Sequence, residues 1–189
     1  MRKIFFSFLS LLFWVSYPTY ANETYILDPS HTYVEWKVKH FGYSTISGKW
    51  LAEGKVNVDP AQSKINTISV VIQMNKLVTG IPKLDTHLSN SDFFDVEKYP
   101  EATFESLTTE VKGKRAMIKG KLTLHGITKP ITLQAKINKI DVHPMTHKKT
   151  IGFSADTQLQ RSAFDVGKYA PSVSDDVTIH IEGEASLES

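Results

Sequence analysis

The sequence predicts an all-β, antiparallel protein, with a closed barrel favoured over a sandwich and one short helical insert. Most of the chain alternates apolar and polar residues in eight or nine runs joined by short turns, which is typical of strands with one buried face. Continuous apolar runs, which characterise parallel sheets between helix layers, are missing. The strands are long for a sandwich, and one is punctuated by glycine, which favours a barrel. A barrel of about eight strands is either filled by side chains or holds one small ligand.

The N-terminal segment has the layout of a secretory signal peptide. The basic pair Arg2-Lys3 precedes an apolar run, Ile4–Val15, and Thr19-Tyr20-Ala21 then offers a small residue at each position that a signal peptidase reads. At about twelve residues, the apolar run is short of the ~20 needed to span a bilayer. We therefore predict that residues 1–21 are cleaved after export to the periplasm, with secretion as the alternative destination, and that no stable membrane anchor remains.

The composition limits the classes of partner. The 189 residues include no cysteine, 22 Lys+Arg and 20 Asp+Glu, so loss of Arg2 and Lys3 leaves residues 22–189 with balanced charge. A balanced charge speaks against nucleic acid and against binding to an anionic membrane surface. Without cysteine there is no disulfide and no lipoprotein anchor, so stability must come from burial and backbone pairing. Residues 22–189 fit a single domain without internal repeats.

The expected strands follow one another along the chain. Before the insert they are Thr24–Leu27, Thr32–His40, Ile46–Val58 and Ile65–Met74. After it they are Ala102–Leu107, Met117–His125, Ile131–Ile137, Ile151–Leu159 and Val177–Glu182. In the long strand Ile46–Val58, glycines fall on the apolar side, where a strand coils sharply or leaves room inside.

The segment Asp85–Pro100 is the one long stretch that does not alternate. Leu84, Leu88 and the Phe93-Phe94 pair give it an uneven, helix-like apolar stripe, with Asp85 as the expected N-cap. The proline at its end stops the helix, because the residue before a proline avoids helical geometry. A short apolar helix among strands predicts a lid or plug on the barrel.

The residue patterns of metal sites and of nucleophilic catalysis are missing from the sequence. His143 and His147 are four apart, but Pro144 between them argues against a helix, and two ligands do not make a closed zinc site. The sequence has neither cysteine nor GxSxG nor HExxH. We therefore expect no metal, no required cofactor and no catalytic residue.

The inward-facing residues of the strands make up the candidate binding surface. They are Trp36, Val38, Trp50, Val56, Ile72, Met74, Phe104, Leu122, Leu124, Phe153 and Ile179. An ordinary packed core is one interpretation. Small inward residues such as Gly48, Gly54 and Gly120 favour an open tunnel instead. Periodicity alone does not decide between the two.

Three polar residues are candidates for contact with the head group of a ligand. His40 lies on the apolar face of its strand, His87 lies in the insert, and Arg161 follows a late strand. The alternative for the histidines is a hydrogen-bonded place in the core. For Arg161 the alternative is an ion pair with Asp165 or Asp92 at the end of the barrel.

Three motifs carry a resemblance to a known family. DPSHTYVEWKVKHFG, DTHLSNSDFFDVEKYPEATFES and KGKLTLHGITKPITLQA, within a match from about Tyr25 to Glu184, resemble the YceI-like polyisoprenoid-binding proteins. The tripeptide Gly48-Lys49-Trp50 is also similar to the GxW of lipocalins.

The resemblance implies a lipocalin-like, extended antiparallel eight-stranded barrel with an apolar tunnel. Family members hold an isoprenoid chain, such as a quinone tail, or another long-chain amphiphilic lipid. The ligand is then expected between the barrel wall and the insert, which adds to the lining His40, Leu84, His87, Leu88, Phe93 and Phe94. Such a protein serves as a carrier, store or stress-linked sensor, and a homodimer is compatible with it. The alternatives are an enzyme with a histidine base and a packed barrel that acts through its loops.

Overall fold

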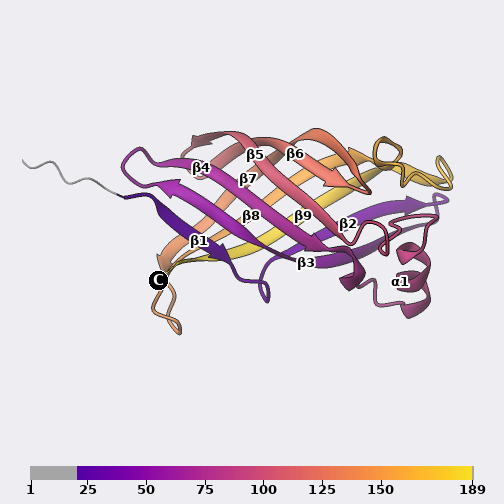
Figure 1. The fold of residues 1–189 in the computed structure, drawn as a ribbon, viewed down its shortest axis with the longest axis horizontal. Coiled ribbons are helices and arrows are strands. Elements are labelled where there is room, and N and C mark those ends of the chain that lie inside the picture. The colour runs from indigo at the N-terminus through magenta and orange to yellow at the C-terminus, as the bar shows by residue number, and fades with distance from the viewer. Residues whose placement is uncertain (1–20, 189) are drawn as a thin grey trace, which may run out of the picture.

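The computed structural model describes residues 21–188 and confirms the all-β prediction: an antiparallel eight-stranded closed barrel with one short α-helix (Figure 1). Apart from Ala21, the predicted signal peptide lies outside the described residues. The strands are β1 (Glu23–Leu27), β2 (Tyr33–His40), β3 (Ser44–Asp59), β4 (Lys64–Gln73), β5 (Glu101–Lys112), β6 (Arg115–Leu124), β7 (Ile127–Val142), β8 (Lys149–Gln160) and β9 (Val173–Leu187). The helices are α1 (Pro82–Ser89) and the 3₁₀ helices η1 (Met74–Lys76) and η2 (Arg161–Phe164).

Closure of the sheet follows from the strand pairing. From β2 the order runs through β9, β8, β7, β6, β5, β4 and β3, and β3 pairs again with β2. Strand β1 also pairs with both β3 and β9, but beyond the end of β2. The nine described strands therefore fill eight positions, because β1 and β2 are two halves of one interrupted strand.

The interruption between β1 and β2 is fastened to β9. The Thr32 hydroxyl is buried; it donates to the carbonyl of Glu184 at 3.2 Å and accepts the N–H of the same residue at 3.3 Å. The N–H of Asp28 donates to that carbonyl at 2.8 Å, and the Asp28 carboxylate lies 2.7 Å from His31 Nδ1. Asp28, His31 and Glu184 bring three metal-ligand atoms within 4.8 Å of one another, fewer than the four of a closed zinc site.

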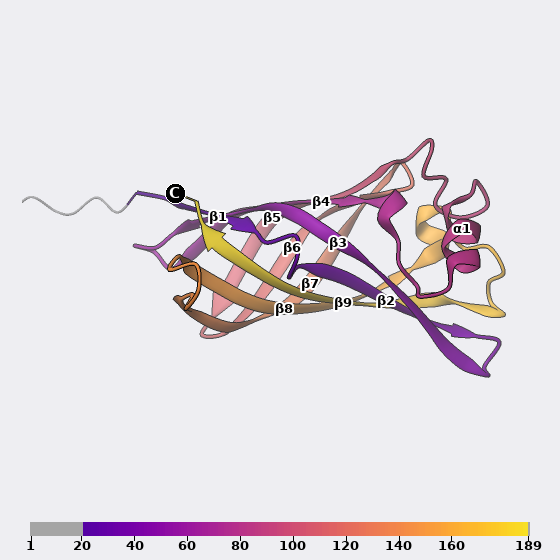
Figure 2. The same cartoon turned by 90° about the horizontal axis from the view of Figure 1, so that it is seen from below.

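The barrel is elongated and its two ends differ. Strands β3 and β7 have 16 residues each, about 50 Å at roughly 3.3 Å per residue. Helix α1, the β2–β3 turn and residues 161–172 lie at one end, here the helix end (Figures 1 and 2). The start of β1, the C-terminus and the β7–β8 hairpin lie at the other, the far end.

The insert begins earlier than expected, and the prediction that Asp85 is its N-cap is wrong. Helix α1 starts at Pro82, whose ring presets helical φ, and Ile81 is the N-cap. The Asp85 carboxylate instead accepts the N–H and the hydroxyl of Thr79, at 2.8 and 2.6 Å. Residues 90–100 form turns rather than helix. The expected position over the barrel is found, because Leu88 and Phe93 of the insert are buried in one cluster with residues of β2 and β3.

Among residues 21–188, the helices are too short and too polar for any of them to cross a membrane.

The close approach of β3 and β4 at Gly54 gives a test of the packing. A Cβ on Gly54 would lie 2.2 Å from the carbonyl oxygen of Ser69. Because this oxygen belongs to the backbone, no change of side-chain rotamer can relieve the clash. We expect Gly54→Ala to lower the free energy of unfolding, measured by urea denaturation, by about 1–3 kcal/mol. The control is Gly152→Ala on β8, where the nearest atom lies 4.0 Å away. Both changes alter the entropy of the unfolded chain alike, so equal stabilities would contradict the packing assigned to Gly54.

Candidate functional site

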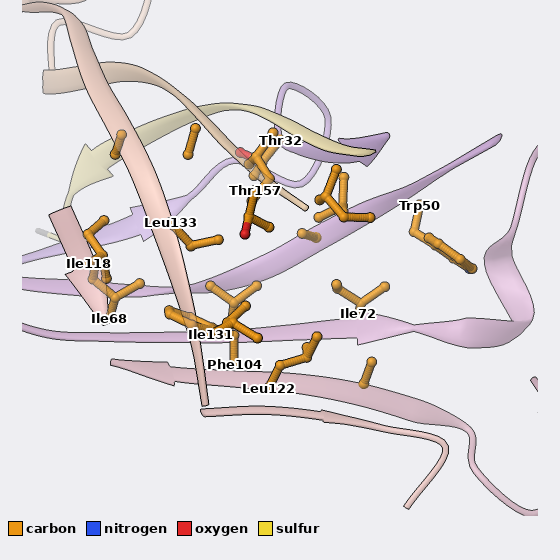
Figure 3. A pocket seen from close by; sticks show the side chains of 18 of the residues that line it. Thr32, Trp50, Ile68, Ile72, Phe104, Ile118, Leu122, Ile131, Leu133 and Thr157 are labelled. Carbon is orange, nitrogen blue, oxygen red and sulfur yellow. The ribbon is translucent and has the colours of Figure 1, made fainter. Parts of the chain in front are cut away.

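A cavity of about 670 Å³ runs through the barrel from the helix end to the far end. Its wall contains residues of every strand and of α1, and apolar side chains make up most of it (Figure 3). In the close-up, Ile72, Phe104 and Leu122 approach one another from neighbouring strands, and the hydroxyls of Thr32 and Thr157 interrupt the carbon surface. This volume lies within the roughly 300–1,000 Å³ of ligand pockets.

Every residue predicted to line a binding site lies on the wall of this cavity. The inward face of each strand and the side chains of the insert meet there, as the alternation and the helix-like stripe predicted. Their contact with a ligand stays a prediction, and the structure adds the geometry in which it would occur.

Aromatic rings lie against inward glycines, which explains how a barrel so rich in aromatic residues stays open. In three pairs, a Cβ on the glycine would lie between 2.3 and 2.6 Å from the ring. The pairs are Trp36–Gly48, Phe104–Gly120 and Phe153–Gly183. Each ring occupies the volume that a side chain on the glycine would fill, and so it lines the wall without crossing the lumen. The choice between packed core and tunnel, left open by periodicity, is decided by these contacts.

The aromatic contacts at the helix end hold the insert on the barrel. Trp50 donates its indole N–H to the carbonyl of Met74 at 3.1 Å, which fixes the ring. Phe94 of the insert meets Trp50 edge-on, with ring centroids 5.2 Å apart. The insert therefore forms part of the cavity wall.

The two candidate histidines reach the cavity at the helix end. His87 is exposed on α1, 4.9 Å from the ring of Phe93, and His40 is half-buried, 4.6 Å from the ring of Phe41. Within the described residues, neither makes a hydrogen bond or an ion pair with a carboxylate. They are thus polar groups at the rim of an apolar wall, without the partner that orients a catalytic base.

Arg161 also lines the cavity, but its donors are directed at the backbone. Its Nε donates to Ser174, Nη1 to Val166 and Lys168, and Nη2 to Val173, at distances between 2.8 and 3.3 Å. Burial lowers the pKa of Arg161, while nearby Asp175 acts in the opposite direction. Four of its five N–H groups are therefore used to fasten the segment after η2 to the start of β9.

The ion pair with Asp165 or Asp92 that was the alternative for Arg161 is not formed in the described part of the chain. Asp92 pairs instead with Lys168, and Asp165 lies 3.9 Å from His125 Nδ1. The backbone carbonyls near Arg161 are the closer acceptors, and a fork of N–H groups satisfies several of them at once. Ion pairs between the insert and the segment after η2 therefore involve Lys168.

A polar group that the sequence analysis missed lies at the far end. Glu23 accepts two hydrogen bonds from the Lys149 ammonium, at 2.8 and 3.1 Å, and one from the Tyr25 hydroxyl at 2.6 Å. Both charged residues line the cavity. Lys149 and then Tyr25 lower the pKa of Glu23, and Glu23 raises the pKa of Lys149. A signal for Glu23 was present, because it shares its strand face with Tyr25 and Leu27, both buried.

The carboxylate of Glu23 gives a pH-dependent test of this group. Its lowered pKa means that the interaction stabilises the fold above about pH 4.5, and that this stabilisation is lost as the pH falls through the lowered value. We expect Glu23→Gln to lower the free energy of unfolding at pH 7 by up to about 1 kcal/mol, because the pair is partly exposed.

The difference between Glu23→Gln and the unchanged chain should shrink progressively in urea denaturation as the pH is lowered below 4.5. Glu97→Gln, at an exposed carboxylate without a hydrogen bond or an ion pair among residues 21–188, is the control and should change the free energy of unfolding little. A penalty for Glu23→Gln that stays the same as the pH is lowered would contradict the assigned hydrogen bonds.

Comparison with known proteins agrees with this geometry. The model of the YceI-like domain matches residues 25–185. A UPF0312 protein of Pseudomonas putida (strain W619) is 38% identical over 159 residues, which cover 82% of this chain and 82% of that protein.

Two solved structures share the fold. Burkholderia cenocepacia BcnA superposes with a TM-score of 0.74 at 24% identity, covering 84% of this chain and 98% of that one. A polyisoprenoid binding domain from Saccharophagus degradans, implicated in plant cell wall breakdown, superposes with a TM-score of 0.67 at 14% identity. The match covers 87% of this chain and 98% of that one. Since the matched model spans almost the whole barrel, the chain belongs to the YceI-like domain family.

Proposed function

We propose that the chain is a non-enzymatic binding protein that holds one long-chain lipid, such as a polyisoprenoid, inside the barrel. The observation that carries this proposal is the apolar cavity of about 670 Å³, which is continuous from the helix end to the far end. An elongated apolar lumen suits a flexible chain better than a compact ligand. The polyisoprenoid binding domain from Saccharophagus degradans shares the barrel and supports this class of ligand.

Burial of the chain supplies enough free energy without a charge partner. At about 0.8 kcal/mol per buried CH₂, a five-carbon isoprene unit contributes about 4 kcal/mol of gross transfer free energy. A few units exceed the roughly 4–15 kcal/mol that association costs in lost motion. Specificity would then depend on the length of the tunnel and on polar groups at its two ends.

Three further expectations belong to the same proposal. Export through residues 1–21 would place the protein in the periplasm as a carrier, store or sensor of lipid. No cofactor beyond the bound lipid would be required. Against the enzyme alternative, His40 and His87 have aromatic neighbours and, among residues 21–188, no acidic or nucleophilic side chain bonded to them of the kind that catalysis needs.

Mass spectrometry of a denaturing solvent extract of natively purified full chain tests the proposal. We expect about one long-chain lipid per protein molecule. A chain that is empty, and that also takes up no diphenylhexatriene, a neutral rod-shaped apolar dye, would overturn it.

A matched pair of glycine variants shows whether the lipid occupies the lumen. In Gly183→Val the three atoms nearest to the new Cβ all belong to the ring of Phe153, at 2.3 to 2.9 Å, so this ring of the cavity wall has to move. Its lipid content or dye affinity should fall about tenfold, equivalent to about 1.4 kcal/mol. In Gly152→Val the nearest atom to the Cβ is 4.0 Å away, so retention should be unchanged. Equal retention by both variants, with thermal unfolding confirming that both are folded, would place the lipid outside the barrel.

A further inference from the structure

The charged residues of the cavity wall are concentrated at the far end. Glu23, Lys64, Lys136 and Lys149 line it there, and the ammonium group of Lys149 contacts the carboxylate of Glu23. At the helix end the wall has one permanent cation, Arg161, and backbone carbonyls take most of its donors. The cavity wall therefore has three lysines and one glutamate at the far end, although residues 22–189 are balanced overall.

Lys149 has donor capacity that the protein does not use. Its ammonium group has three N–H donors, and the two hydrogen bonds to the Glu23 carboxylate leave one of them open. Glu23 divides its acceptors between Lys149 and the hydroxyl of Tyr25. Lys64 and Lys136 form no ion pair within residues 21–188.

The far end also retains contact with water. The side chain of Lys149 is 41% exposed and that of Glu23 is 25% exposed. An ionised group placed there keeps part of its hydration and gains charge-assisted hydrogen bonds. The same group in the middle of the tunnel would lie against Ile68, Phe104 and Leu133, where an unpaired charge is strongly disfavoured.

We propose that the ligand is an amphiphile with an acidic head group, carboxylate or phosphate, which binds at the far end against Lys149, while its chain extends towards α1. This inference rests on the proposed function and specifies the class and the orientation of the lipid. Glu23 competes with the head group for the same ammonium, so it weakens binding of an acid and has little effect on a neutral lipid. Lys64 and Lys136 add attraction from the rim.

Three ligands with the same hexadecyl chain test the proposal: palmitic acid, hexadecyl phosphate and 1-hexadecanol. Each displaces diphenylhexatriene from the full chain, and the apparent Kd is measured. We expect at least one acid to bind about tenfold more tightly than the alcohol. The acid with the lower Kd shows whether the site suits carboxylate or phosphate.

Two variants of the same ion pair should change this preference in opposite directions. Lys149→Met keeps the apolar stem and removes the charge, so the acid should lose its advantage while the Kd of the alcohol stays the same. Glu23→Gln frees the ammonium, so the preference for acid should increase several-fold. A purely structural pair would give the same direction of change in both variants. The control is Lys121→Met, at an exposed lysine of β6 that does not line the cavity.

The outcomes are distinct. Equal Kd values for acid and alcohol in the unchanged chain, or identical behaviour of Lys149→Met and Lys121→Met, would overturn the placement of the head group. Failure of all three ligands to displace the dye would overturn the proposed function itself. If Lys149→Met does not fold, Lys64→Met and Lys136→Met replace it. Each should reduce the preference for acid over alcohol, measured as the ratio of the two apparent Kd values. If neither variant reduces this ratio, the placement of the head group is also overturned.

Discussion

Closure of the sheet is the constraint on which the rest of the molecule depends. Because β3 pairs with both β2 and β4, and β9 with both β2 and β8, no long edge is left open at the seam. Closure also sets the register, since a slip of one residue would turn every inward side chain outward. The interrupted β1–β2 strand is tolerated because Thr32 and Asp28 bond to Glu184 across the break. The elongated interior is the direct result of long strands in a fixed register.

Whether such an interior is full or hollow depends on where its aromatic rings lie. Phe104 and Phe153 could fill the lumen, but each lies over a glycine of a neighbouring strand. The glycine supplies the missing volume, and the ring shields the backbone that the glycine exposes. The cavity therefore stays open through contacts between rings and glycines in its wall. A protein built this way keeps an apolar surface available inside the barrel while its outer face remains polar.

Much of the fold and of the cavity wall could be predicted from the sequence, because alternation reports the direction of each side chain. Trp36 and Val38 were placed inside on this basis, and both are buried on the cavity wall. Alternation carries no information on how far a ring tilts towards its neighbour, so the volume of the cavity could not be predicted. Glu23 and Lys149 were missed because both lie at the starts of strands, where the charged residue reads as part of the preceding loop.

The two ends of the tunnel differ in their contacts and in their exposure to water. At the helix end, Phe94 packs on Trp50 and Arg161 fastens the segment after η2, so contacts within the protein hold the insert and this segment in place. At the far end, the ion pair of Glu23 and Lys149 stays partly in water, which lowers the cost of having charge beside an apolar lumen. A symmetric tunnel would accept an amphiphile in either direction. In the proposed complex, the difference in charge and hydration between the ends would give the two orientations of the amphiphile different free energies. The barrel would then have a direction that its closed sheet alone does not supply.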